Sequence, residues 1–169
     1  QSINTIKHLK SHPSIFAYTI YNEGWGQQAA SKTYEILKPI DKNRLFDSTS
    51  GWFFDDKSDF DSYHVYFRNK VLKHKDKILA LTECGGFTLN LRSDTNKSTY
   101  GYGKSKDIED LTNKIIDMYE KMYYPSIKNG LVMAIYTQIS DVENEINGLY
   151  SFDRKTCKVN KEKILKLNK

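Results

Sequence analysis

Residues 12–26 read HPSIFAYTIYNEGWG, and this stretch decides how the rest of the chain is interpreted. Its apolar and aromatic part predicts a buried strand over 15–22, with Pro13 near the strand start. The polar pair Asn22-Glu23 stands where the apolar run stops. A carboxylate at the carboxyl end of a buried parallel strand is where α/β barrels hold catalytic groups, and a plain polar turn is the alternative for a single such pair.

The rest of the sequence alternates between helix and strand patterns. Helical spacing of apolar residues predicts helices over 2–11, 29–37, 106–124 and 160–167, and apolar runs predict strands over 44–48, 61–66, 78–82 and 131–138. This alternation predicts an α/β fold with a parallel sheet. Residues 88–105 are polar and predict a long loop, of the kind that often serves as a lid or a binding loop.

Each predicted strand has a polar or aromatic residue at its carboxyl end. These residues are Glu23, Trp52, Tyr66, Glu83 and Gln138. In a barrel they would converge on one rim, which is where barrel enzymes carry their active sites. The sequence contains no G-x-G-x-x-G motif and no P-loop, so it gives no support to a doubly wound sheet with a nucleotide crevice.

Composition narrows the class of partner. The 169 residues are 38% hydrophobic and 28% charged, which is typical of a globular domain. The net charge of +5 comes mostly from scattered lysines, with only four arginines, so a solvated lysine surface is favoured over a nucleic-acid interface. Two cysteines, Cys84 and Cys157, form no disulfide framework or metal motif, and no apolar run is long enough to cross a membrane.

Glu23 and Glu83 both end apolar strands, and in a barrel they would face each other across the central opening. Two carboxyl groups on either side of a sugar are the groups that glycosidic cleavage needs. One protonates the departing oxygen, and the other attacks the anomeric carbon or activates water. Retaining enzymes place the two groups about 5 Å apart and inverting enzymes about 6.5–9.5 Å apart.

Several short segments carry distinctive motifs: His12-Pro13-Ser14-Ile15, Asn22-Glu23-Gly24-Trp25-Gly26-Gln27, Ser50-Gly51-Trp52, Asp61-x-x-His64-x-Tyr66, Thr82-Glu83-x-Gly85-Gly86 and Tyr136-Thr137-Gln138 with Asp141, Glu143, Glu145 and Asn147-Gly148-Leu149. In these motifs the sequence resembles the family 2 glycoside hydrolases, which include β-galactosidases and β-glucuronidases. These segments follow one another in order from residue 12 to about 154, so they cover nearly the whole chain.

The resemblance implies a role for each matching residue. It implies that Glu23 is the acid/base and Glu83 the nucleophile, with retention of configuration, and that Tyr66 donates a hydrogen bond to Glu83. It implies that Asn22 binds the sugar 2-hydroxyl, that Trp25 and Trp52 stack on the apolar face of the sugar, and that Tyr136 and Gln138 line the pocket. Core packing is the alternative for Trp52. His64 is either a sugar contact or a buried structural histidine. Asp141, Glu143 and Glu145 are expected in a structural or solvated acidic turn rather than a cation site.

The resemblance also implies the fold, a TIM-type (β/α)8 barrel present here only as strands four to eight. Residues 1–169 would then be a single domain, the C-terminal portion of the barrel, without the first strands and the preceding β-sandwich domains. Five strands do not close a barrel. The open edges predict either self-association or an open half-barrel.

The leading functional hypothesis is a retaining, β-galactosidase-like β-glycosidase that hydrolyses terminal β-linked sugars without a cofactor or a catalytic metal. The alternative is a catalytically incomplete fragment that acts as a carbohydrate-binding or structural part of a larger enzyme. Only Arg68 and Arg92 among the arginines lie near the expected rim, which leans slightly toward a neutral sugar over a glucuronide. Nucleic acid and membrane are not expected as partners.

Overall fold

The chain passes back and forth between two structural units. The computed structural model describes residues 1–24, 26–91 and 99–168. The first unit contains Gln1–His64, Lys73–Thr82 and Gly130–Met133. The second contains Val65–Leu72, Glu83–Asn129 and Ala134–Lys169.

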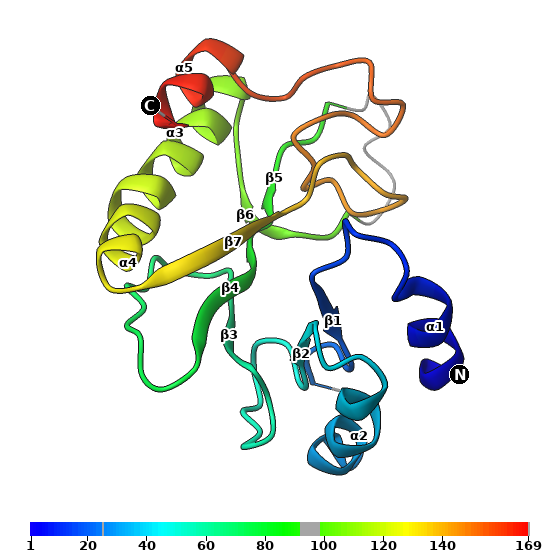
Figure 1. Cartoon of the computed structure of the whole chain (residues 1–169). Coiled ribbons are helices and arrows are strands. Elements are labelled where there is room, and N and C mark those ends of the chain that lie inside the picture. Colours follow the sequence, from blue (N-terminus) through cyan, green and yellow to red (C-terminus); the bar gives the residue numbers. More distant parts are fainter. Residues whose placement is uncertain (25, 92–98, 169) are drawn as a thin grey trace. The chain divides into compact units, whose positions relative to one another are not determined.

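The first unit begins with two helices around a short parallel ladder (Figure 1). Its elements are α1 (Ser2–Leu9), β1 (Ala17–Thr19), α2 (Ala30–Leu37), the 3-10 turn η1 (Lys38–Ile40) and β2 (Leu45–Asp47). Strands β1 and β2 pair in parallel, with Ala17 opposite Leu45. The helices predicted over 2–11 and 29–37 are both confirmed. The strand predicted over 15–22 is shorter than expected because its partner β2 contributes only three residues to the ladder.

The core of these elements forms where apolar residues from both helices meet β2. Ile6 of α1, Leu37 of α2 and Phe46 of β2 are buried together. The Phe46 ring lies 5.2 Å from the ring of Tyr18 and 6.2 Å from that of Tyr34. This packing fixes the ends of β1 and β2, from which the loops with the candidate site residues begin.

Three longer strands start in the first unit and end in the second. They are β3 (Phe60–Val65), β4 (Ile78–Gly85) and β7 (Leu131–Thr137), and their order in the sheet is β3-β4-β7. Side chains of β3 alternate between buried and half-buried, whereas β4 is buried along most of its length. The apolar run 78–82 was expected to end in residues 83–86, and β4 indeed ends at Gly85, so Glu83 lies among its last residues.

The second unit contains the main helical segment and a second parallel ladder. Helix α3 (Ile108–Met118) continues through a π turn, η2 (Tyr119–Tyr123), into α4 (Tyr124–Lys128), and the chain ends with α5 (Lys161–Leu165) and η3 (Lys166–Asn168). The Asp107 side chain caps α3 by accepting from the Asp110 N–H at 2.8 Å. The helix predicted over 106–124 is therefore present, although it is not one regular α-helix.

The segment predicted as a long loop contains a ladder at its two ends. Strand β5 (Phe87–Thr88) pairs in parallel with β6 (Tyr102–Lys104), so the expectation of a wholly irregular loop is wrong. Residues 92–98 of this segment lie outside the described residues. The strand pairing of the described residues gives three separate sheets, two of which have only two strands. Within the described residues, none of the helices has both the length and the apolar character needed to cross a bilayer.

Candidate functional site

Glu23 and His64 form the centre of the site in the first unit. Glu23 follows β1, and its carboxylate oxygen Oε2 contacts Nδ1 of His64 in β3. The His64 side chain is fully buried, whereas 18% of the Glu23 side chain is exposed. The other ring nitrogen, Nε2, lies 2.9 Å from the hydroxyl of Ser50. His64 therefore joins a solvent-accessible carboxylate to a buried hydroxyl.

The turn after β2 is shaped to receive the imidazole ring. Gly51 has a φ of +101°, and a Cβ atom at this position would overlap the His64 ring. Its N–H donates to the Ser62 hydroxyl at 3.2 Å, and that hydroxyl donates to Oδ1 of Asp47 at 2.9 Å. Burial raises the pKa of Asp47, and the hydrogen bond from Ser62 opposes this effect. Glycine at position 51 is thus required by both the backbone conformation and the close ring contact.

The residue types Ser50, His64 and Glu23 are those of a serine-hydrolase triad, but their surroundings do not suit that chemistry. Ser50 and His64 are buried, so the hydroxyl is closed to a substrate. An oxyanion hole needs a backbone N–H next to the nucleophile, and the Gly51 N–H is already donated to Ser62. The exposed reactive group of this set is the Glu23 carboxylate.

Glu83 and Tyr66 form the corresponding pair in the second unit. The Tyr66 hydroxyl donates a hydrogen bond to Oε2 of Glu83, which is the contact that the family resemblance implied. A hydroxyl that donates to a carboxylate orients it and stabilises its negative charge. Tyr66 itself is buried, and its ring stacks on that of Tyr102 at a centroid distance of 4.0 Å.

The sequence analysis missed the support from Tyr102 because it placed this residue in a loop. Tyr102 belongs to β6, and its ring also lies at 5.1 Å from the ring of Phe67. Gly86 makes the stacking possible, since a side chain there would collide with the rings of Tyr102 and Tyr66. The signal was present in the repeat Tyr100-Gly101-Tyr102-Gly103, whose alternation is that of a strand.

Cys84 points to the face of β4 opposite to Glu83. Its sulfur lies 2.7 Å from the Tyr123 hydroxyl and 3.2 Å from the Ile135 carbonyl oxygen. Adjacent side chains of a strand point to opposite faces, so the Glu83 carboxylate points away from the helical segment that carries Tyr123. Burial raises the pKa of the Cys84 thiol to about 12. Cys84 is therefore a packing residue.

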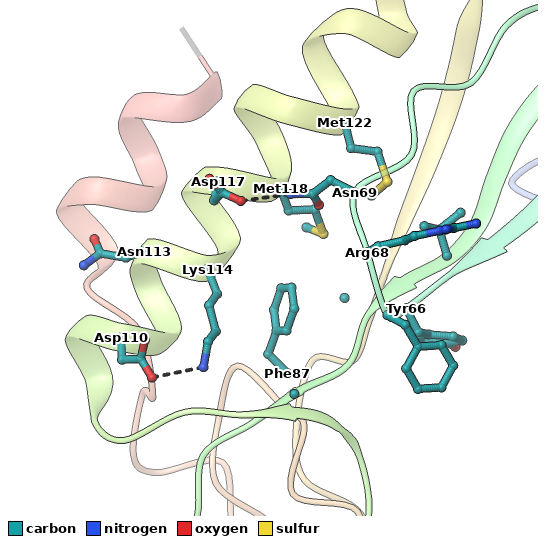
Figure 2. A pocket seen from close by; sticks show the side chains of 14 residues that line it. Tyr66, Arg68, Asn69, Phe87, Asp110, Asn113, Lys114, Asp117, Met118 and Met122 are labelled. Carbon is teal, nitrogen blue, oxygen red and sulfur yellow. Dashed lines mark hydrogen bonds and ion pairs between the residues drawn. The ribbon is translucent and has the colours of Figure 1, made fainter.

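A cavity of about 360 Å³ lies on this helical side of the second unit. Figure 2 shows Phe87 and Met118 projecting into the space between α3 and the segment that carries Arg68 and Asn69. Two hydrogen-bonded bridges border it, Lys114 to Asp110 at 3.0 Å and Asn69 to Asp117 at 2.9 Å (Figure 2). Among the described residues that line this cavity, Tyr66 is present and Glu83 is not.

The two residues predicted at the end of the last strand are engaged in structural contacts. The Gln138 amide donates to Glu145 and to Asn147, both at 2.8 Å. The Tyr136 ring packs against Gly85, and burial raises its pKa. Tyr136 and Gln138 therefore lie near the end of β7, as the sequence predicted. In the part of the chain that the structure describes, both side chains contact other protein groups.

The acidic turn after β7 is structural, as predicted. Oδ1 of Asp141 accepts from the buried Lys158 ammonium at 2.7 Å and from the Gly148 N–H at 2.9 Å. Lys158 also donates to the Ile146 carbonyl oxygen at 2.8 Å. This pair ties the turn to the segment that precedes α5.

The remaining predicted residues lie at the surface or outside the described residues. Asn22 and Trp52 are exposed and belong to the first unit with Glu23 and His64. Arg68 is exposed. It belongs to the second unit, as do Glu83, Tyr66, Tyr136 and Gln138. Trp25 and Arg92 lie outside the described residues.

One residue of the matching motif has a role that the sequence analysis did not assign. The Gln27 amide donates to the carbonyl oxygens of Asn22 and Thr49, both at 2.7 Å. It thereby ties the turn that carries Glu23 to the turn that carries Ser50 and Gly51.

The chain was compared with models of protein families and with curated proteins, and neither comparison gave a match.

Proposed function

We propose that this chain is the C-terminal part of the catalytic barrel of a retaining, β-galactosidase-like β-glycosidase. The observation that carries the proposal is the hydrogen bond from the buried Tyr66 hydroxyl to Glu83. It gives the proposed nucleophile an oriented carboxylate. The other glutamate, Glu23, has a different partner, since its carboxylate contacts the His64 imidazole, and this difference in surroundings supports a separate role for it.

The proposed reaction is a double displacement. Glu23 gives its proton to the glycosidic oxygen while the Glu83 carboxylate attacks the anomeric carbon, so the bond to the leaving group breaks and a glycosyl ester forms. Glu23 then takes a proton from water, and the resulting hydroxide breaks the ester at the same carbon. The sugar leaves with its original configuration, and both carboxyl groups return to their starting states. No cofactor enters these steps.

The test is the intact mass of the chain after incubation with a panel of 2-fluoro-glycosyl fluorides. These reagents form the glycosyl ester but release it slowly, so a mass increase of one fluorosugar on Glu83 is expected. Glu83→Gln should take up no label. Glu35→Gln is the matched control, since Glu35 pairs with Lys57 at the surface and should not change labelling.

The role of Glu23 is tested separately with Glu23→Ala and sodium azide. Azide needs no general base, so it should accelerate release of the labelled intermediate in Glu23→Ala and give a β-glycosyl azide. Labelling on another residue, or azide rescue of Glu83→Ala giving the β-azide, would contradict the assignment. Absence of label at every concentration would favour the alternative, a catalytically incomplete carbohydrate-binding part of a larger enzyme.

A further inference from the structure

Three consecutive aromatic side chains are exposed in the loop after β2. Trp52, Phe53 and Phe54 are 46%, 57% and 61% exposed. Single exposed apolar residues are ordinary, but contiguous exposed aromatic surface commonly marks a binding site. Residues 51–57 are called the aromatic loop below.

The aromatic loop is fixed at its far end by hydrogen bonds. The Asp55 carboxylate accepts from the Ser31 hydroxyl and, at 2.9 Å, from the Lys57 N–H. The Lys77 ammonium donates to the carbonyl oxygens of Asp55 and Asp56 at 2.9 and 3.0 Å. A loop held in this way loses little conformational entropy when a ligand binds.

Ring contacts fix the third aromatic residue. The Phe54 ring lies 5.2 Å from the Tyr63 ring at an angle of 65°, and the Lys75 ammonium lies 5.9 Å from its centre. No ring contact holds Phe53 among the residues that the structure describes. Phe53 therefore presents its ring to solvent on a loop whose backbone is held in place.

The near end of the aromatic loop lies beside Glu23. Gln27 ties the Asn22 and Thr49 carbonyl oxygens together, and a Cβ atom on Gly24 would lie 4.0 Å from Cε3 of Trp52. The Trp52 ring is thus in van der Waals reach of the residue that follows Glu23. All of these residues belong to the first unit.

We propose that the aromatic loop binds sugar units of the leaving group, so that the substrates are β-linked oligosaccharides rather than glycosides of small alcohols. The proposal rests on the proposed role of Glu23 as the acid, because an acid that protonates the leaving oxygen lies on the leaving-group side of the bond. Sugar rings have apolar C–H faces that pack on aromatic rings and hydroxyl edges that stay in water.

Charge around the aromatic loop favours a neutral ligand. Asp55 and Asp56 lie within the loop, and Lys57, Lys75 and Lys77 lie within or beside it. Lys57 pairs with Glu35 at 3.5 Å, so the two aspartates balance the two remaining lysines, whereas nucleic-acid binding needs a surplus of positive charge. A neutral oligosaccharide carries no charge for these side chains to repel.

The first arm of the experiment measures binding without turnover. Galactotetraose is titrated calorimetrically into the Glu83→Gln variant, with and without Phe53→Ala. Saturable binding is expected, weakened about tenfold by Phe53→Ala through the loss of one stacking contact. Phe152→Ala is the matched control, because Phe152 is 61% exposed on a different loop. Phe53 serves as the probe because removing Phe54 would also remove its packing on Tyr63.

The second arm measures the ratio of kcat/KM for galactotetraose to that for nitrophenyl β-galactoside. Phe53→Ala should lower this ratio about tenfold, and Phe152→Ala should leave it unchanged.

An equal ratio in the two variants, together with equal binding, would overturn the proposal while the glycosidase function stands. Binding that depends on Phe53 in a chain that takes no label would support the sugar site and contradict the glycosidase function. An effect of Phe53→Ala on sedimentation alone would identify a second copy of the chain as the occupant and overturn the proposal.

Discussion

Cys84 lies next to the proposed nucleophile, yet its environment makes its thiol inert. Burial raises its pKa to about 12, and Tyr123 and Ile135 surround the sulfur. We expect Cys84 to react with a disulfide reagent at pH 8 at least about a hundredfold more slowly than Cys157, because the thiolate is the reactive form. Counting labelled thiols by mass in native and urea-unfolded protein tests this.

The expected result is one labelled thiol in the native protein and two after unfolding, since Cys157 is half-buried and Cys84 is buried. Cys157→Ser serves as the control and should leave the native protein without rapid labelling. Rapid native labelling of that variant would show that the Cys84 environment is open.

Some side-chain contacts of the candidate site could be predicted from the sequence and others could not. The contact of Tyr66 with Glu83 could be expected, because the resemblance implied a hydrogen bond between these two residues. The second partner of His64 could not, because its bond to Ser50 depends on how the turn at Gly51 folds against the ring. Such a contact is a property of the folded turn and not of residue spacing.

At the scale of elements, Asp59 connects α2, η1 and β2 in the first unit. Its carboxylate accepts from the Lys38 ammonium at 2.7 Å, the Phe46 N–H at 2.8 Å and the Tyr34 hydroxyl at 2.8 Å. Burial alone would raise its pKa, but the hydrogen bonds from Lys38, Phe46 and Tyr34 hold the pKa below its usual value. Asp59 is therefore more stabilising when charged.

We expect Asp59→Asn to lower the free energy of unfolding by about 2 kcal/mol at pH 7, mainly through weaker hydrogen bonds to Lys38 and Phe46. A group whose pKa is lower in the folded state stabilises above the unfolded-state pKa, near 3.8 here. The difference between wild type and variant should therefore persist above that pH and shrink as the pH falls below it. Urea unfolding across this pH range measures it.

Asp56→Asn is the matched control, because the Asp56 side chain makes no hydrogen bond or ion pair within the described part of the chain. It should keep the stability and the pH profile of the wild type. A constant difference between wild type and Asp59→Asn down to pH 3 would contradict the role of the charged carboxylate.

The existence of elements was easier to predict than their limits. All five predicted strands and all four predicted helical segments occur, because each carries a long enough apolar pattern. The β5–β6 ladder was missed, since its strands have two and three residues and pair across a polar segment. The π turn after α3 was missed as well, because the apolar spacing continues through it without a break.

At the scale of the whole molecule, β7 is the last strand of the sheet β3-β4-β7, and Val132 on it is 70% exposed. An exposed apolar strand with a hydrogen-bonded neighbour on one side is a template for pairing with another chain. We expect concentration-dependent self-association by sedimentation velocity over about a hundredfold range of concentration. Val132→Lys should suppress it, since a charge on an edge strand opposes pairing.

Leu165→Lys is the control for a general gain in solubility, because Leu165 is 66% exposed but lies on α5. It adds the same charge and removes a similar apolar surface, so its sedimentation should remain that of the wild type. Equal suppression by both variants would assign the association to net charge or to scattered apolar contacts. A wild-type protein that sediments as a monomer over the whole range would contradict pairing through β7, and the open strand would then be tolerated by the isolated chain.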